Sequence, residues 1–271
     1  MNLLIKFFEI LDTRMETPPM YGWFHFMWVG IIIASTILLC YLYKKGIVKN
    51  VRAVLLAVSI TVMVLEVYKL LMFGLSYKDG ISYHFPWGSL PWQFCSTPMY
   101  IGLIAGLTKG KVHDFCCSFL ATFAVFAGVA IMVYPNAVFM YMLGVNIQTM
   151  ICHGSMITIG AFLYYTGTVK TKFTTLFKGA AVFSICVTIA TIINEIGHVV
   201  GLTEREYFNM FYISRHEPPH LPVYSIIQEN ISFYPLCLAI YIFGFTLAAC
   251  LMLLAAMGIK KIGSKFKKKE N

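Results

Sequence analysis

The sequence predicts an all-α fold, a polytopic membrane bundle of seven transmembrane helices preceded by an N-terminal interfacial helix. Of the 271 residues, 59% are hydrophobic and only 12% are charged, and the mean hydropathy is +0.74. These values exclude a soluble enzyme, a disordered chain and a disulfide-rich secreted scaffold. The apolar residues form long runs without the period-two alternation of barrel strands, which favours helices.

The N-terminal segment, residues 1–20, differs from the rest of the chain. Its apolar residues recur at helical spacing, but charged residues interrupt them, so the segment is neither a signal peptide nor a span. We expect a helix in the outer membrane interface that ends before Pro18 and Pro19, because proline stops a helix.

Seven apolar runs between residues 21 and 259 form the predicted transmembrane domain. A helix needs about 20 residues to cross the hydrocarbon core, and the runs satisfy this length except for the short third one. Six spans with a re-entrant third segment are the alternative. The runs cover residues 21–43, 52–74, 92–108, 112–133, 148–167, 174–201 and 232–259.

Lysine and arginine are concentrated in alternate connections and in the basic tail, residues 260–271. Fifteen of them lie on one predicted side of the membrane and five on the other. Because cationic loops remain in the cytoplasm, this pattern predicts a cell-membrane protein with its N-terminus outside and its C-terminus inside. The net charge of +9 therefore reflects topology and contact with lipid headgroups, and nucleic acid is not an expected partner.

Polar residues of the spans lie mainly in their outer halves. Each is costly in lipid unless it faces the bundle interior and finds a partner, so we expect several helices to share one outward-facing polar cavity. Separate local pairs are the alternative, since Glu66 and Lys69 share one helix face. The residues expected to bind a ligand there are His25, Glu66, Lys69, Gln93 and His198.

A cysteine and a histidine in this region are candidates for catalysis. Cys95 follows Pro91 near the start of a short span, where the partial positive charge of a helix N-terminus favours a thiolate. His153 lies at a similar predicted depth and is a candidate base, and Glu195 or Asn194 is a candidate for orienting its ring. Structural or ligand-binding roles for these residues remain the alternative.

A metal site is a weaker hypothesis. Glu195 and His198 have the spacing used in helical-bundle metal sites, but no second metal-binding motif accompanies them, so no metal or other cofactor is expected. The aromatic connection 202–231 and the uncharged connection 134–147 are expected to cover the mouth of the bundle, or to anchor it in the interface. A cover of this kind suits an amphiphilic small-molecule ligand.

The segment from Leu90 to Pro98, with Gln93 and Cys95, resembles a Pro-x-(His/Gln)-x-Cys motif of the YwaF-like family of bacterial integral membrane proteins. His153-Gly154 and the region from Asn194 to Phe211 are similar to later signatures of that largely uncharacterised family. The family is distantly similar to a eukaryotic transmembrane acyltransferase that remodels ether phospholipids. This resemblance implies that Cys95 accepts an acyl group and that His153 is the base.

Two functions follow as alternatives. The first is a lipid-modifying enzyme in which Cys95 attacks an acyl ester of a membrane lipid. The second is a binding or transport protein that holds a small polar or amphiphilic ligand without covalent chemistry. The sequence leaves the substrate and the oligomeric state open.

Overall fold

The protein is an all-α helical bundle of the polytopic membrane type, as the sequence predicts. The computed structural model describes residues 2–77, 80–135, 138–218 and 221–267. Within these ranges, six helices are long and apolar enough to cross a membrane. They are α2 (Trp23–Lys44), α3 (Val51–Gly74), the continuous helix Gly110–Val133, α7 (Leu143–Tyr165), α8 (Phe173–Val199) and α10 (Tyr234–Lys267).

The remaining elements are short. The helix Gly110–Val133 consists of α5 (Gly110–Phe119), a single π-helical turn η2 (Leu120–Ala124) and α6 (Val125–Val133). A two-residue hairpin, β1 (Leu75–Ser76) and β2 (Ser82–Tyr83), follows α3. The others are α1 (Asn2–Leu11), η1 (Trp87–Ser89), α4 (Thr97–Leu107), η4 (Met210–Tyr212) and α9 (Pro222–Asn230).

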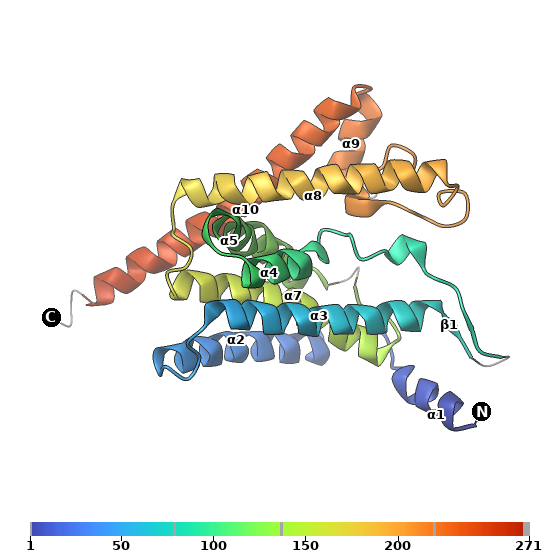
Figure 1. Cartoon of the computed structure of the whole chain (residues 1–271), viewed down its shortest axis with the longest axis horizontal. Coiled ribbons are helices and arrows are strands. Elements are labelled where there is room, and N and C mark those ends of the chain that lie inside the picture. Colours follow the sequence, from blue (N-terminus) through green and yellow to red (C-terminus); the bar gives the residue numbers. More distant parts are fainter. Residues whose placement is uncertain (1, 78–79, 136–137, 219–220, 268–271) are drawn as a thin grey trace.

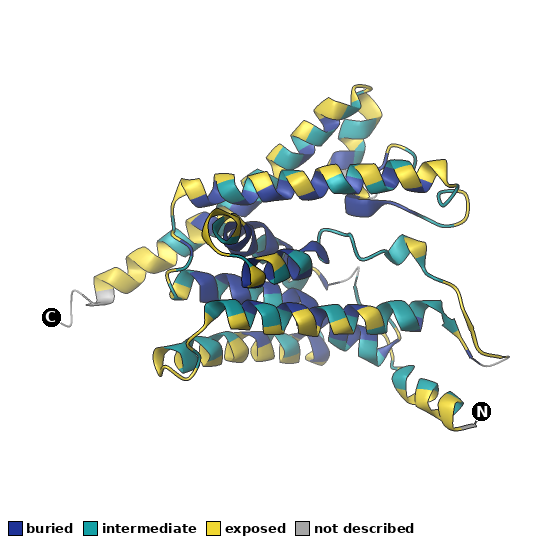
Figure 2. Ribbon diagram, viewed as in Figure 1, coloured by how far each residue is buried: buried dark blue, intermediate teal, exposed yellow. Residues whose placement is uncertain are grey.

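The long helices lie side by side, and the two termini lie at opposite ends of the bundle (Figure 1). We call the end that carries α1 and the β hairpin the α1 end, and the opposite end the tail end. Helix α3 packs on α4, α5 on α8, and α7 on both α2 and α6. Buried residues face inward, whereas the outer faces of α2, α3 and α8 are largely exposed (Figure 2). These exposed apolar faces are suited to contact with lipid.

The third predicted span, 92–108, is the 11-residue helix α4 preceded by an irregular segment. At about 1.5 Å per residue, α4 is too short to cross a hydrocarbon core of about 30 Å alone. Its Gly102 and Gly106 allow α3 to approach closely, since a Cβ atom at Gly106 would lie 2.4 Å from Leu56. Arg52 donates to the carbonyl groups of Gly106 and Leu107 and so caps the end of α4.

A second irregular segment enters the bundle from the α1 end. We call residues 207–216 the inner loop. Its Met210, Phe211 and Ile213 are at most 1% exposed. Phe211 and Tyr212 have φ angles of 59° and 56°, a left-handed conformation that non-glycine residues adopt only when their surroundings hold them there.

Cations are concentrated at the tail end, where the loops after α2, α4 and α7 and the end of α10 lie (Figure 1). Helix α10 continues to Lys267, so the predicted basic tail, 260–271, begins as helix, and residues 268–271 lie outside the described ranges. Helix α1 has exposed Leu3, Phe7 and Ile10, and its placement in a membrane interface stays a prediction.

Candidate functional site

Cys95 lies inside the bundle, two residues before the first residue of α4. It lines a cavity of about 30 Å³ between α3, α4 and α7. A cavity of this size holds about one water molecule. The other lining residues are apolar or small: Leu55, Val58, Ser59, Val62, Pro98, Met99, Gly102, Leu120, Cys152, Ser155, Met156 and Ile159.

Cys152 of α7 lies beside Cys95 in this cavity. Its Sγ donates to the backbone carbonyl oxygen of Cys95 at 3.6 Å, and the two residues form no disulfide. The cavity therefore contains two free thiols from two different elements.

A chain of hydrogen bonds begins at the ion pair of Glu66 and Lys69 on α3. The side chain of Glu66 is 4% exposed, and its Oε1 accepts from Lys69 Nζ. Its Oε2 accepts from Gln148 Nε2 at 2.9 Å, and Gln148 Oε1 accepts from Thr149 Oγ1 at 3.3 Å. The backbone oxygen of Thr149 is bonded to Nδ1 of His153 at 2.8 Å, so the chain connects α3 to that imidazole.

The contact with Thr149 fixes the protonation pattern of His153. A carbonyl oxygen can only accept, so Nδ1 carries the proton and Nε2 of the neutral ring has a lone pair. His153 is 5% exposed, and its Nε2 makes no hydrogen bond to the described residues. Cys152, whose Sγ contacts the backbone oxygen of Cys95, directly precedes His153 on α7. No hydrogen bond joins Cys95 to His153 within the described ranges.

Gln93 and Asn194 hold the backbone of the inner loop. Gln93 donates to Asn209 O at 2.9 Å and accepts from Phe211 N at 2.8 Å. Asn194 donates to Met210 O at 3.0 Å and accepts from Met210 N at 2.7 Å. Irregular backbone at membrane depth must be satisfied by protein groups, and these two amides do so. Both side chains are therefore occupied, and Asn194 does not contact the ring of His153.

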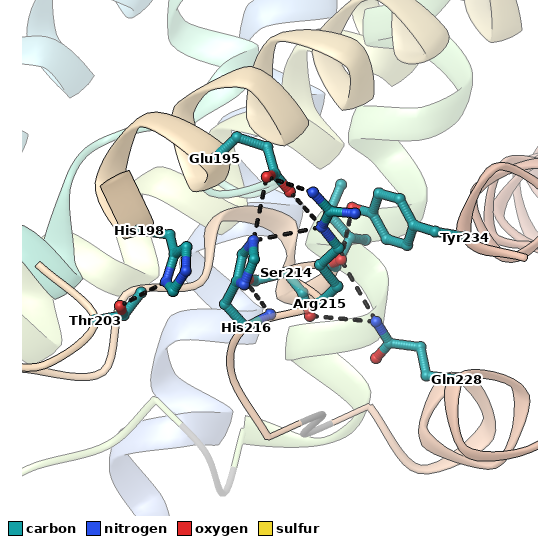
Figure 3. Close-up of polar contacts among 9 residues, drawn as sticks. Glu195, His198, Thr203, Ser214, Arg215, His216, Gln228 and Tyr234 are labelled. Atoms are coloured by element: carbon teal, nitrogen blue, oxygen red, sulfur yellow. Dashed lines mark hydrogen bonds and ion pairs between the residues drawn. The ribbon is translucent and has the colours of Figure 1, made fainter. Parts of the chain in front are cut away.

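Glu195 lies in a separate cluster at the α1 end of α8 (Figure 3). Its two carboxylate oxygens accept from Arg215 Nε and Nη2, each at 2.9 Å, and one also contacts His216 Nε2 at 3.1 Å. The hydrogen bonds to the Glu195 carboxylate raise the pKa of Arg215 above its ordinary value. The rings of His198 and His216 stack in parallel with centroids 3.7 Å apart, and His198 Nδ1 contacts Thr203 Oγ1. We call these residues the outer cluster.

His25, another expected ligand-binding residue, lies in the first turn of α2. It is 2% exposed, and its Nε2 bonds to Met132 O at 2.9 Å near the end of α6. Its ring also packs against Phe139. These contacts link α2 to α6, and a ligand-binding role for His25 stays a prediction.

The expected common polar cavity is not seen in the described structure. The polar groups form four sets instead: His25 with α6, the chain from Lys69 to His153, the two amides on the inner loop, and the outer cluster. Among the described residues, no group of three or more His, Cys, Asp or Glu side chains is arranged to hold a metal ion.

The covering connections also have specific contacts. In the connection 134–147, of which residues 136–137 lie outside the described ranges, Tyr141 O and Leu143 N pair with the backbone of Met15 and Thr13. In the connection 202–231, of which residues 219–220 lie outside them, the inner loop enters the bundle core. Neither segment is therefore a simple cover over an open cavity.

Sequence reasoning missed Thr149, Asn209, Arg215 and His216 as partners of site residues. Asn209 accepts from Ser214 N at 2.8 Å and so closes the inner loop on itself. The sequence does carry a local signal for this loop, because the polar Asn209 lies within a stretch of aromatic residues. The pairing of Arg215 with Glu195 joins positions 20 residues apart and has no local signal.

The profile of the TMEM164 family matches residues 20–257 of this chain. The match begins before α2 and ends within α10, and it includes Cys95, the Lys69–His153 chain and the outer cluster. It does not test the narrower YwaF-like resemblance, which stays a prediction. The chain matches no curated protein and no solved structure.

Proposed function

Because the chain belongs to the TMEM164 family, a family of membrane proteins, we propose that this multi-pass protein transfers acyl groups between membrane lipids, with Cys95 as the nucleophile and His153 as the base. One observation carries the proposal. A free thiol, Cys95, lies in the bundle interior two residues before α4 and contacts Cys152, the residue directly before the buried His153, whose Nε2 is left as the proton acceptor.

Opposing influences act on a thiolate at Cys95. Burial and the Glu66 carboxylate disfavour it, whereas the ammonium group of Lys69 and the partial positive charge at the N-terminus of α4 stabilise negative charge near Sγ. The latter two groups would stabilise the oxyanion that forms when a carbonyl carbon is attacked. The neutral ring of His153 can take the thiol proton at Nε2 while Nδ1 keeps its hydrogen bond to Thr149.

The reaction has two balanced half-steps. In the first, Sγ of Cys95 attacks the carbonyl carbon of an acyl ester, the ester C–O bond breaks, and the proton held by His153 passes to the departing lipid alcohol. In the second, the hydroxyl of an acceptor lipid attacks the thioester, its proton passes to His153, the C–S bond breaks, and His153 returns the proton to Sγ of Cys95. The acyl group thus moves from one lipid to another with no oxidant or cofactor consumed.

The residues Glu66, Gln148 and Thr149 act as positioning residues. They connect Lys69 to the His153 ring and hold the ring in one tautomer. The orienting role expected for Glu195 or Asn194 is therefore assigned to the Thr149 carbonyl group. Gln93 and Asn194 support the inner loop, which packs on Phe94 next to Cys95.

The cationic loops at the tail end support an orientation with this end in the cytoplasm and the N-terminus outside the cell membrane. Cys95 and His153 then lie in the outer half of the bundle, where lipids of the outer leaflet are the nearest substrates. Attaching a membrane-impermeant thiol label to a cysteine introduced at Gly46 tests this, since the proposal expects labelling only in opened cells.

Acyl transfer is tested with purified protein in nanodiscs that contain a phospholipid with a labelled acyl chain and an unlabelled lysophospholipid. We expect transfer in the wild type, a hydroxylamine-sensitive acyl group on the peptide that contains Cys95, and neither in Cys95→Ser. Cys250→Ser is the matched control, since this half-buried thiol lies on α10 outside the site. Equal transfer or equal acylation in Cys95→Ser would refute the proposal.

The second candidate is a lipid-binding or transport protein without covalent chemistry. The lack of a hydrogen bond between Cys95 and His153 in the described structure favours it, as does the small size of the cavity. Its test is the melting temperature in the presence of lysophospholipid. A gain that is lost in Glu66→Gln but kept in Cys95→Ser would support binding alone.

A further inference from the structure

We propose that α9 and α10 form a second lipid site, separate from Cys95, which binds a membrane amphiphile with a zwitterionic head and a hydrocarbon chain. The head would lie near Arg215, Gln228 and Glu229, and the chain would lie in the groove beside Tyr224. This inference does not depend on the acyl-transfer chemistry of Cys95.

The chain-binding part is an apolar groove of about 390 Å³ between α9, α10 and α6. Tyr224 and Ile227 of α9, Tyr241 and Phe245 of α10, and Phe126 of α6 line it. Two residues on its rim, Val223 and Phe243, are 74% and 63% exposed. Because α10 is one of the candidate spans, this groove opens to the hydrocarbon of the membrane.

A polar pocket of about 330 Å³ lies next to the groove along the same two helices. On α9, Gln228 of the pocket directly follows Ile227 of the groove. On α10, Cys237 of the pocket precedes Tyr241 of the groove by one helical turn, about 6 Å. The polar pocket and the apolar groove therefore lie in the order that the head and the hydrocarbon chain of one amphiphile require.

Two buried polar atoms in this region have no hydrogen-bond partner among the described residues: the Tyr224 hydroxyl and Gln228 Oε1. Tyr224 is 4% exposed, and its ring packs on Tyr241 of α10 with ring centroids 5.0 Å apart. A buried polar group without a partner is destabilising, because it has lost its hydrogen bonds to water. A ligand whose polar linkage lies between pocket and groove would satisfy both atoms.

The charges around the polar pocket indicate the kind of head. Arg215, whose charge is already paired with Glu195, lines the pocket together with the negatively charged Glu217 and Glu229. The two hydrogen bonds from Arg215 to Glu195 use Nε and Nη2, so Nη1 is available for a phosphate. A phosphate near Arg215 and a cationic group near Glu229 would match both signs, whereas a purely anionic head would meet repulsion from the two glutamates.

Aromatic rings separate this groove from Cys95. Phe245 packs on Phe94 with ring centroids 5.2 Å apart, and Tyr241 packs on Phe245 at 4.6 Å. Phe94 directly precedes Cys95, so the wall lies between the groove and the thiol. A lipid bound between α9 and α10 would therefore not touch Cys95 in this arrangement.

The test uses phosphatidylcholine with a photoactivatable diazirine near the middle of its acyl chain, in vesicles that contain the full-length protein. Gly244 lines the groove, and a Cβ atom there would meet nothing within 4 Å, so Gly244→Phe is expected to place a ring in the groove without backbone strain. Gly258, on the same helix and equally open, gives the matched control Gly258→Phe. We expect crosslinks at residues 223–227 and 240–248 to fall about tenfold in Gly244→Phe only.

The head is tested by competition in the wild type, which does not depend on the folding of any variant. Unlabelled phosphatidylcholine should compete about tenfold better than phosphatidylglycerol, and free phosphocholine should compete weakly because it lacks the chain. Glu229→Gln should reduce this preference. Equal crosslinking in Gly244→Phe and Gly258→Phe, equal crosslinking on all outer helix faces, or equal competition by the anionic lipid would each overturn the proposal.

Discussion

Two ion-paired clusters in this protein use similar residues in opposite settings. We call the chain from Lys69 through Glu66, Gln148 and Thr149 to His153 the inner cluster. Its ion pair, Glu66 and Lys69, has side chains that are only 4% and 18% exposed. In the outer cluster, Glu195 and Arg215 are 34% and 55% exposed. Each pair adjoins a histidine, His153 inside and His216 outside. The comparison shows that burial, and not residue type, separates a candidate reaction site from a structural contact.

The difference has an energetic basis. A buried charge that loses its partner costs several kcal/mol, because water cannot replace the partner. An exposed pair is screened by water and salt and contributes little. The inner cluster therefore constrains the geometry around His153, whereas the outer cluster mainly keeps the end of the inner loop on α8 (Figure 3). The predictions below test this division.

The largest effect is expected for Glu66→Gln. The variant leaves the Lys69 ammonium group without its carboxylate in a mostly buried position, so we expect about 3–5 kcal/mol of destabilisation. Chemical denaturation of the purified protein in mild detergent measures it. The double variant Glu66→Gln with Lys69→Met should recover most of the loss, because no unpaired charge remains. A loss below about 1 kcal/mol would show that the inner pair behaves as an exposed one.

An intermediate effect is expected for Asn194→Leu. The change leaves the amide N–H and carbonyl oxygen of Met210 without partners inside the bundle, at a cost of about 2–3 kcal/mol. Hydrogen exchange across residues 207–216 should accelerate, while exchange in α7 should not change. Thr188→Val on the exposed face of α8 is the control, since its hydroxyl bonds only within the helix. Unchanged exchange in the inner loop would contradict the supporting role of Asn194.

The fold class was predictable because it depends on composition and on the length of apolar runs. The runs predicted the six long helices of the described ranges. The third run is short, and in the structure it forms α4 with an irregular segment before it. The single π turn in the helix Gly110–Val133 and the hairpin after α3 were not predicted. Neither has a distinct signal in an apolar sequence.

The candidate site was only partly predictable. The i, i+3 spacing of Glu66 and Lys69 correctly gave their pairing. In contrast, depth alone placed Gln93, Asn194 and Glu195 with His153, although depth says nothing about the direction in which a side chain points. The inner loop is buried in the bundle, and its backbone forms hydrogen bonds with the amide side chains of Gln93 and Asn194. Such contacts between distant segments depend on tertiary packing.

The smallest effect is expected for Glu195→Gln, and it is the sharpest test of the division. A glutamine can keep one hydrogen bond to Arg215 but carries no charge, so the melting temperature should fall by no more than about 2 °C, and by less in 1 M salt, where the Debye length is about 3 Å. Acyl transfer should stay within about twofold of the wild type, because the outer cluster does not contact His153. His198→Ala, which removes the stacked ring and leaves the carboxylate, should behave similarly.

A loss of about 100-fold in transfer at unchanged stability would return Glu195 to a catalytic role, since general acid–base contributions begin at that size. The inner and outer clusters would then form one functional unit, and burial would no longer distinguish them.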